Sequence, residues 1–274
     1  MAINGGTIRH WSHWLSDGNL MGSKSPNMFL LVCAASLLVS GCLCSVPSLD
    51  TETIAVINGE RISSQEFITA LNRNRNKVVS HFRLNYEAEY GNSFWDNEWQ
   101  GINPLAFLKT ISLDDLLRKK VEVANARDFG LIKNNLDPSI PENRVAINKK
   151  RSIALSNDQV IYGPQEYSES VFSRHYYSLM VISLKDHLAK NIFNISDKAL
   201  NEFYKSNKML FSVNGSNVEY RPFSECRSLV RSIYIDQLYD QYITDQTQQA
   251  EYYLNNKVIS DIRWTDSGFS NIGS

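Results

Sequence analysis

Histidines and neighbouring carboxylates are the side chains of this sequence that could act as general acids and bases. Beyond the first fifty residues these are His81, His175, His187, Asp114, Asp115, Asp96 and Glu98. Catalysis by such groups needs a nucleophile or a second titratable group beside them. The sequence shows no GxSxG-like elbow, no GxGxxG or Walker loop and no dense group of metal ligands. We therefore interpret these residues as helix-surface or core residues, and predict no catalytic residue, no metal site and no cofactor.

Cys42 is the side chain whose surroundings predict a covalent modification. It follows Val39-Ser40-Gly41, which end the apolar run of residues 28–39. A run of about a dozen apolar residues fits the ~7–15 of a signal-peptide core and falls short of the roughly 20 that span a membrane. The order apolar, small, small, cysteine resembles the bacterial lipobox. That resemblance implies diacylglycerol on the Cys42 sulfur, cleavage before Cys42 and firm anchoring to the membrane.

The alternative for this region is an uncleaved N-terminal anchor, because the apolar run just reaches spanning length if it is extended through Val46. Both interpretations place the rest of the chain outside the cytoplasm, at the cell membrane. We assign residues 1–41 to the signal peptide, with Met1, Met21 or Met28 as the start, and residues 42–53 to a tether. Cys44 and Cys226 are expected to be free thiols.

Composition excludes several classes of protein. The chain has 274 residues and a formal net charge of −1, with 43% hydrophobic and 21% charged residues. A disordered chain would be poorer in apolar residues and would carry a larger net charge, and four cysteines are too few for a disulfide scaffold of this length. The near-neutral charge argues against a nucleic-acid partner. The length suffices for a core and for one or two domains.

Local patterns predict a mainly α-helical fold with a few short strands. Residues 54–62 read as a strand, an Asn-Gly turn and a short return strand. Ser63 and Glu66 then form a capping box at the start of a helix. Further on we expect a helix that starts at Pro104 and ends near Phe129, with Gly130 as its C-cap. After it we expect a loop over 134–145, helices over 165–190, 195–211 and from Pro222 onward, and a strand over 257–264. Strands near both ends are expected to pack the N- and C-terminal segments together.

The order of these segments resembles the N-terminal peptide-binding domain of the SurA/PrsA-type foldases. The matching pieces are IAVINGERIS, Gln65-Glu66-Phe67, YGNSFW and LDDLLRKKVEVANARDFGLI, and residues 194–208 are similar to the helix that leaves this domain. The resemblance covers most of residues 54–264 and implies a helical chaperone domain. We divide it into an N-terminal part (54–132), a helical middle (133–192) and returning helices (193–264), followed by a tail (265–274).

The chain departs from the foldase pattern where the family carries its catalytic domain. A parvulin-type prolyl isomerase domain lies between the outgoing and returning helices of that family, whereas here only residues 211–221 join them. No domain fits in that length. The three histidines also lack the parvulin arrangement. We therefore expect no isomerase activity by that mechanism, although the family label implies it.

An aromatic, polar segment follows the first predicted helix. It contains Tyr86, Tyr90, Phe94, Trp95 and Trp99. Large rigid aromatic side chains supply contact area at low entropic cost, so these five are candidates for a groove that binds unfolded chains. The alternative is that they bury against the helix around residues 113–121 and build the core.

Together these patterns lead us to expect a lipid-anchored, extracytoplasmic protein that holds unfolded or partly folded exported polypeptides without chemistry. Two other functions stand beside it. One is a prolyl isomerase, as the family label implies. The other is a scaffold lipoprotein that docks a single partner.

Overall fold

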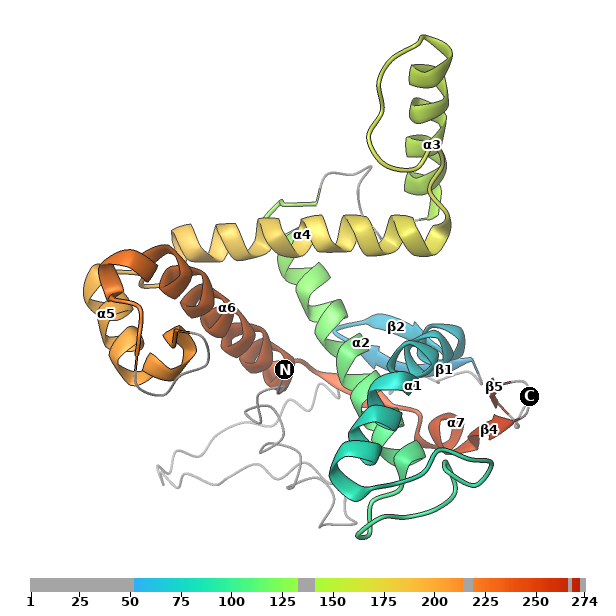
Figure 1. The fold of residues 1–274 in the computed structure, drawn as a ribbon. Coiled ribbons are helices and arrows are strands. Elements are labelled where there is room, and N and C mark those ends of the chain that lie inside the picture. Colours follow the sequence, from blue (N-terminus) through green and yellow to red (C-terminus); the bar gives the residue numbers. More distant parts are fainter. Residues whose placement is uncertain (1–51, 133–140, 214–218, 266–267, 272–274) are drawn as a thin grey trace, which may run out of the picture. The chain divides into compact units, whose positions relative to one another are not determined.

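The computed structural model describes residues 52–132, 141–213, 219–265 and 268–271 (Figure 1). Within these ranges the fold is mainly helical with a few short strands, as the sequence predicts. The helices are α1 (Ser64–Tyr86), α2 (Pro104–Asp128), α3 (Pro141–Ser156), α4 (Glu169–Asn191), α5 (Asp197–Ser206), α6 (Phe223–Gln249) and α7 (Asn256–Asp261), with a 3-10 turn η2 (Lys208–Phe211). The strands are β1 (Thr53–Ile57), β2 (Glu60–Ser63), β3 (Tyr252–Leu254), β4 (Ile262–Thr265) and β5 (Gly268–Asn271).

A small antiparallel sheet joins the two ends of the described chain. Its strand order is β2-β1-β3, and Ala55 of β1 lies opposite Leu254 of β3. Asn58 and Gly59 make the β1–β2 turn with φ of 47° and 82°, the left-handed conformation that an Asn-Gly pair tolerates. The N- and C-terminal segments therefore pack together as predicted, but the strand that pairs with β1 is β3 and not the strand expected over 257–264, whose extended part (β4) pairs with β5.

Local capping signals fix the ends of two helices as expected. The Ser63 side chain accepts from the Glu66 amide, and the Glu66 carboxylate accepts from the Ser63 amide, which completes the predicted capping box. At the end of α2, Gly130 has a φ of +65° and the Leu131 amide donates to the Ala126 carbonyl at 2.8 Å. This is a Schellman motif, so the predicted glycine cap is confirmed.

Three predicted elements differ in the structure. Residues 257–264 are not one strand: α7 occupies 256–261, capped by the Asn255 side chain, and only 262–265 are extended. The spacing of Val258 and Ile262 fits a helical turn as well as a strand. The loop expected over 134–145 gives way to α3 from Pro141, because proline suits the first turn of a helix. The helix expected to run to Phe211 ends at Ser206 and continues as η2.

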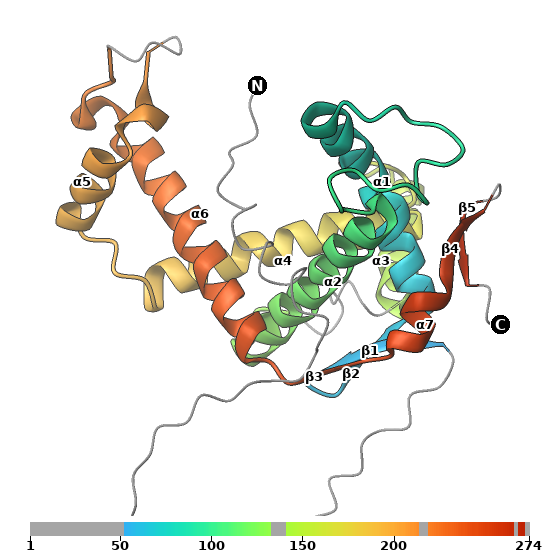
Figure 2. The ribbon, with the colours of Figure 1, turned by 90° about the horizontal axis from the view of Figure 1, so that it is seen from below.

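The main core lies where α1, α2, α4 and α6 meet the sheet. Every residue of β1 is buried, and α1 contributes Phe67, Leu71 and Phe82. Both α2 and α6 pack against α4, and α2 packs against α6 (Figures 1 and 2). A second, smaller core lies between α5, η2 and the start of α6, around Phe203 and Val230.

Residues 141–168, which we call the α3 arm, consist of α3 and a segment that doubles back along it. The Arg151 guanidinium donates to the carbonyls of Tyr162 and Pro164 and lies 4.8 Å from the centre of the Tyr167 ring. Asn148 exchanges hydrogen bonds of 2.9 Å with the backbone of Tyr167. These contacts hold α3 and the segment that follows it together. The α3 arm lies at the N-terminal end of α4 (Figure 1).

Candidate functional site

The five aromatic residues of the predicted groove divide between core and surface. Phe94 and Trp95 are each 1% exposed and belong to the main core, and Tyr86 and Trp99 are partly buried against it. Tyr90 alone is well exposed, at 51%. The Trp95 ring packs against Trp264 and Phe269 of the β4–β5 hairpin. Of this set, Tyr90 is therefore the side chain that a bound chain could reach without rearrangement.

A shallow, open hollow of about 500 Å³ lies beside Tyr90. It is lined by Val79, Arg83, Glu87, Ala88, Glu89 and Tyr90, so it combines a small apolar floor with charges of both signs. An open hollow of this kind suits part of a polypeptide better than an enclosed small-molecule substrate, which is usually bound in a deeper, mostly apolar pocket.

The histidines weighed as bases each stack on an aromatic ring. His81 stacks on Phe107 at 5.0 Å, and partial burial lowers the pKa of His81. His175 stacks on Tyr167 at 5.7 Å, and His187 on Phe129 at 4.6 Å. Across the described ranges, no three His, Cys, Asp or Glu side chains converge as a metal site would require.

Of the paired carboxylates, Asp114 and Asp115 lie on α2, whereas Asp96 and Glu98 lie in the segment between α1 and α2. Asp115 accepts a hydrogen bond from Asn74 Nδ2 at 2.8 Å and lies 3.7 Å from the Arg73 guanidinium, which ties α2 to α1. Asp114, Asp96 and Glu98 are exposed.

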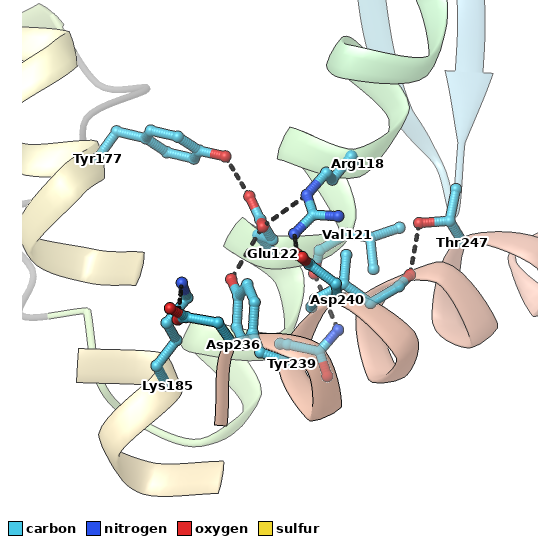
Figure 3. Close-up of polar contacts among 11 residues, drawn as sticks. Arg118, Val121, Glu122, Tyr177, Lys185, Asp236, Tyr239, Asp240 and Thr247 are labelled. Carbon is cyan, nitrogen blue, oxygen red and sulfur yellow. Dashed lines mark hydrogen bonds and ion pairs between the residues drawn. The ribbon is translucent and has the colours of Figure 1, made fainter. Parts of the chain in front are cut away.

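A buried carboxylate that the sequence analysis did not single out lies where α2, α4 and α6 meet (Figure 3). Glu122 of α2 is 2% exposed. Its Oε1 accepts from Tyr239 Oη of α6 at 2.9 Å and from Arg118 Nε at 3.1 Å. Its Oε2 accepts a short hydrogen bond from Tyr177 Oη of α4. We call Glu122, Arg118, Tyr177 and Tyr239 the Glu122 junction.

The electrostatics of the Glu122 junction keep every donor protonated. Burial, and then the Glu122 charge, raise the pKa values of Tyr177 and Tyr239 well above the usual range. Burial alone would lower the pKa of Arg118, but Glu122 and Asp240 more than offset it, so that pKa is raised. Both tyrosines therefore stay neutral donors and Arg118 stays a cation.

Two cationic side chains contact the ring of Tyr239. Arg118 of α2 lies 5.7 Å from the ring centre and Lys185 of α4 lies 4.9 Å from it. Each cation is also paired with α6, Arg118 with Asp240 at 2.7 Å and Lys185 with Asp236 at 2.8 Å. Charged groups from three helices thus converge on one aromatic side chain (Figure 3).

The sequence signal for this junction is weak. Glu122 lies between two apolar residues, Val121 and Val123, which are both buried in the structure. A charge inside such a run suggests a buried acid, but its partners Tyr177 and Tyr239 are 55 and 117 residues away and no local pattern connects them.

Exposed large apolar side chains concentrate in the α3 arm and α4. We call the following eight residues the α3–α4 apolar set: Val145, Ile153, Leu155, Val160, Tyr162, Val171, Leu179 and Ile182. Val160 and Tyr162 are the most exposed, at 82% and 87%. On α4, Leu179 and Ile182 lie away from the buried residues Met180 and Leu184, which pack inward. Concentrated exposed apolar side chains are typical of interaction surfaces.

Two cysteine predictions fall on different parts of the chain. Cys42, the predicted lipidation site, lies outside the described residues, as do Cys44 and the predicted signal peptide. Cys226 is a buried free thiol whose Sγ lies 3.2 Å from the Pro222 carbonyl. In the ranges that the structure describes, no helix is both long and apolar enough to span a membrane.

Comparison with known proteins finds two relatives of low identity. The chain is 22% identical over 188 residues to a protein named foldase protein PrsA from Caldanaerobacter subterraneus subsp. tengcongensis, covering 68% of this chain and 53% of the relative. It is 19% identical over 204 residues to a protein named chaperone for lacto-N-biosidase from Bifidobacterium longum subsp. longum, covering 74% of this chain and 69% of that protein. The chain therefore spans only about half the length of the PrsA relative. No family model matches the chain, and no solved structure matches it.

Proposed function

We propose that this chain is a chaperone-like protein that binds unfolded or partly folded exported polypeptides and performs no chemistry on them. Its two relatives carry the names foldase and chaperone, which supports a chaperone-like role in general. Beyond this general role we propose the kind of client, an unfolded exported polypeptide, and the surface that binds it.

The observation that carries the proposal is the α3–α4 apolar set. Eight large apolar side chains are exposed over less than forty residues, although α4 buries Met180, Leu184 and Leu188 on another side of the helix. Exposed apolar side chains that share one helix face, as Val171, Leu179 and Ile182 do on α4 by their spacing, favour contact with a partner. Unfolded polypeptides expose apolar side chains in extended stretches and are suitable partners. Tyr90 and its hollow offer a second contact, which combines an exposed aromatic ring with charged side chains of both signs.

We also propose that Cys42 carries the lipid and holds the protein at the extracytoplasmic face of the membrane. The support is the lipobox-like sequence that ends at this cysteine. Radiolabelled fatty acid fed to expressing cells should label the wild-type chain and not a Cys42→Ala variant. Equal labelling of both chains would refute lipidation at this residue.

The client proposal is tested by light scattering from a chemically unfolded protein diluted into buffer with the purified full chain. We expect wild type to suppress scattering at near-stoichiometric ratio. Leu179→Gln with Ile182→Gln should raise the concentration needed for half-suppression about fivefold or more, since burying each such side chain contributes more than 1 kcal/mol. Leu84→Gln is the matched control, because Leu84 is 78% exposed on α1, outside the set. An absence of suppression by folded wild type would refute the proposal.

A dedicated chaperone for one protein is the second candidate. The name of the Bifidobacterium relative specifies a single enzyme as client. Tight binding of one partner, without suppression of unrelated unfolded proteins, would favour this candidate over a general one.

A further inference from the structure

The Glu122 junction connects α4, on which the α3 arm packs, to α6, on which α5 packs. Tyr177 lies on α4, and the α3 arm packs on α4. Tyr239 lies on α6, and α5 packs on the other end of α6. A single carboxylate on α2 receives a hydrogen bond from each of these two helices (Figure 3).

Apolar packing between these helices is not directional, whereas these hydrogen bonds are. Helices that meet through aliphatic side chains can shift or rotate at modest cost. A buried carboxylate with both oxygens occupied allows little such movement, because any shift that breaks one bond leaves a buried polar group unpaired. Buried ionic networks often add little net stability, and in some proteins they select one arrangement among several.

We propose that Glu122 is a positioning residue for client binding, which fixes the orientation of α4 on α2 and α6 and thereby the presentation of the α3–α4 apolar set. This inference rests on the proposed function, since it assigns Glu122 a role in the surface that holds the client. Glu122 itself does not touch the client, because it is 2% exposed.

The decisive variant replaces the polar network with apolar groups of similar size: Glu122→Leu, Tyr177→Phe and Tyr239→Phe together. Arg118 keeps its ion pair with Asp240 at 2.7 Å and is partly exposed, so no isolated charge is left behind. Replacing a buried carboxylate together with both of its hydroxyl donors is close to neutral for stability, whereas removing one partner alone is costly. The triple variant is therefore expected to fold with a melting temperature near that of wild type.

Two readouts on the full chain separate positioning from stability. We expect the amides of α4 in the triple variant to exchange with deuterium about tenfold faster than in wild type, with those of α1 unchanged. The concentration for half-suppression of client scattering should rise several-fold. The single variant Glu122→Gln keeps a side-chain amide that can hydrogen-bond to Tyr177, Tyr239 and Arg118. Its α4 exchange rates and its half-suppression concentration should therefore stay near those of wild type.

Leu108→Ala is the control for a general loss of stability. Leu108 is fully buried in the main core away from the junction, and its truncation lowers stability without touching the network. It should leave client suppression intact at temperatures where it is folded. If it weakens suppression as much as the triple variant does, stability and not positioning is the cause, and the proposal is wrong.

The outcomes also separate this proposal from the proposed function. A folded triple variant with wild-type exchange in α4 and wild-type suppression would overturn the positioning role. Should the triple variant not fold, Tyr177→Phe alone, which removes one donor from α4, gives the same comparison on exchange and suppression. Failure of wild type itself to protect clients would refute the proposed function, while the exchange rates would still report whether Glu122 orients α4.

Discussion

Replacing Trp95 with alanine should destabilise the fold and not merely remove a contact for a client. The Trp95 ring has four aromatic neighbours, with centroid distances of 4.9 Å to Phe94, 5.4 Å to Phe269, 5.8 Å to Trp264 and 6.3 Å to Tyr90. Two of these neighbours belong to the β4–β5 hairpin, so Trp95 ties that hairpin to the rest of the core.

The magnitude follows from burial. A tryptophan buries roughly 150–250 Å², which at about 25 cal/mol per Å² corresponds to about 4–6 kcal/mol as an upper estimate. The indole Nε1 is buried without a hydrogen-bond partner in the described structure. Wild type already bears that cost of about 1–3 kcal/mol, which the substitution removes. The expected loss in the free energy of unfolding is therefore about 2–4 kcal/mol.

Urea unfolding of the full chain, followed by far-ultraviolet circular dichroism, measures this loss independently of tryptophan fluorescence. Trp95→Phe, which keeps a ring and removes the unpaired N–H, should lose less than half as much. Tyr90→Ala is the control and should change the free energy of unfolding by less than about 1 kcal/mol, because Tyr90 is 51% exposed. A Trp95→Ala protein as stable as wild type that no longer protects clients would refute this reasoning and restore Trp95 to the binding surface.

Three further predictions concern local features. Ser63→Ala removes the acceptor that caps α1 and should lower the free energy of unfolding by about 1 kcal/mol in a urea titration, whereas Ser80→Ala in mid-helix should not. Gly130→Ala forces alanine into a φ of +65° and should cost about 1 kcal/mol in the same titration, even though a Cβ there meets open space; an unchanged midpoint would contradict the Schellman geometry. Burial, together with the Arg263 charge, lowers the pKa of Lys109 from 10.5 to about 8. Above pH 8 the Lys109 side chain has lost its proton in the folded chain but keeps it in the unfolded chain. The free energy of unfolding should therefore rise between pH 8 and 9.5, and Lys109→Met should flatten that rise.

Features set by neighbouring residues were predictable from the sequence. The Asn-Gly turn, the capping box at Ser63 and the glycine end of α2 each depend on chemistry within about six residues, and all three are confirmed. The mainly helical fold class follows from spacing alone and is likewise confirmed.

Features set by distant residues were not predictable in this way. The Val258–Ile262 spacing fits both a helix and a strand, and β3 was missed because its identity as a strand depends on pairing with β1. In the aromatic segment, Tyr90 is exposed while Trp95 is buried by a hairpin that forms from residues 262–271. The Glu122 junction likewise requires three helices to be in place before its polar partners meet.

The pairing of β1 with β3 also constrains the order in which the chain can fold. Ala55 and Leu254 face each other across the sheet although they lie about 200 residues apart, so this contact is among the most non-local in the molecule. Contacts of this kind form late, because the loop that they close is long and its entropy must be overcome first. β3 can join β1 only once the long segment between them, α1 to α6, has brought the two strands together. Until then β1 pairs with β2 alone, and the backbone groups along its other edge have no strand partner, although β1 is fully buried in the finished fold. While the chain folds, the edge of β1 that later pairs with β3 is therefore open to pairing with a strand of another chain, which favours aggregation.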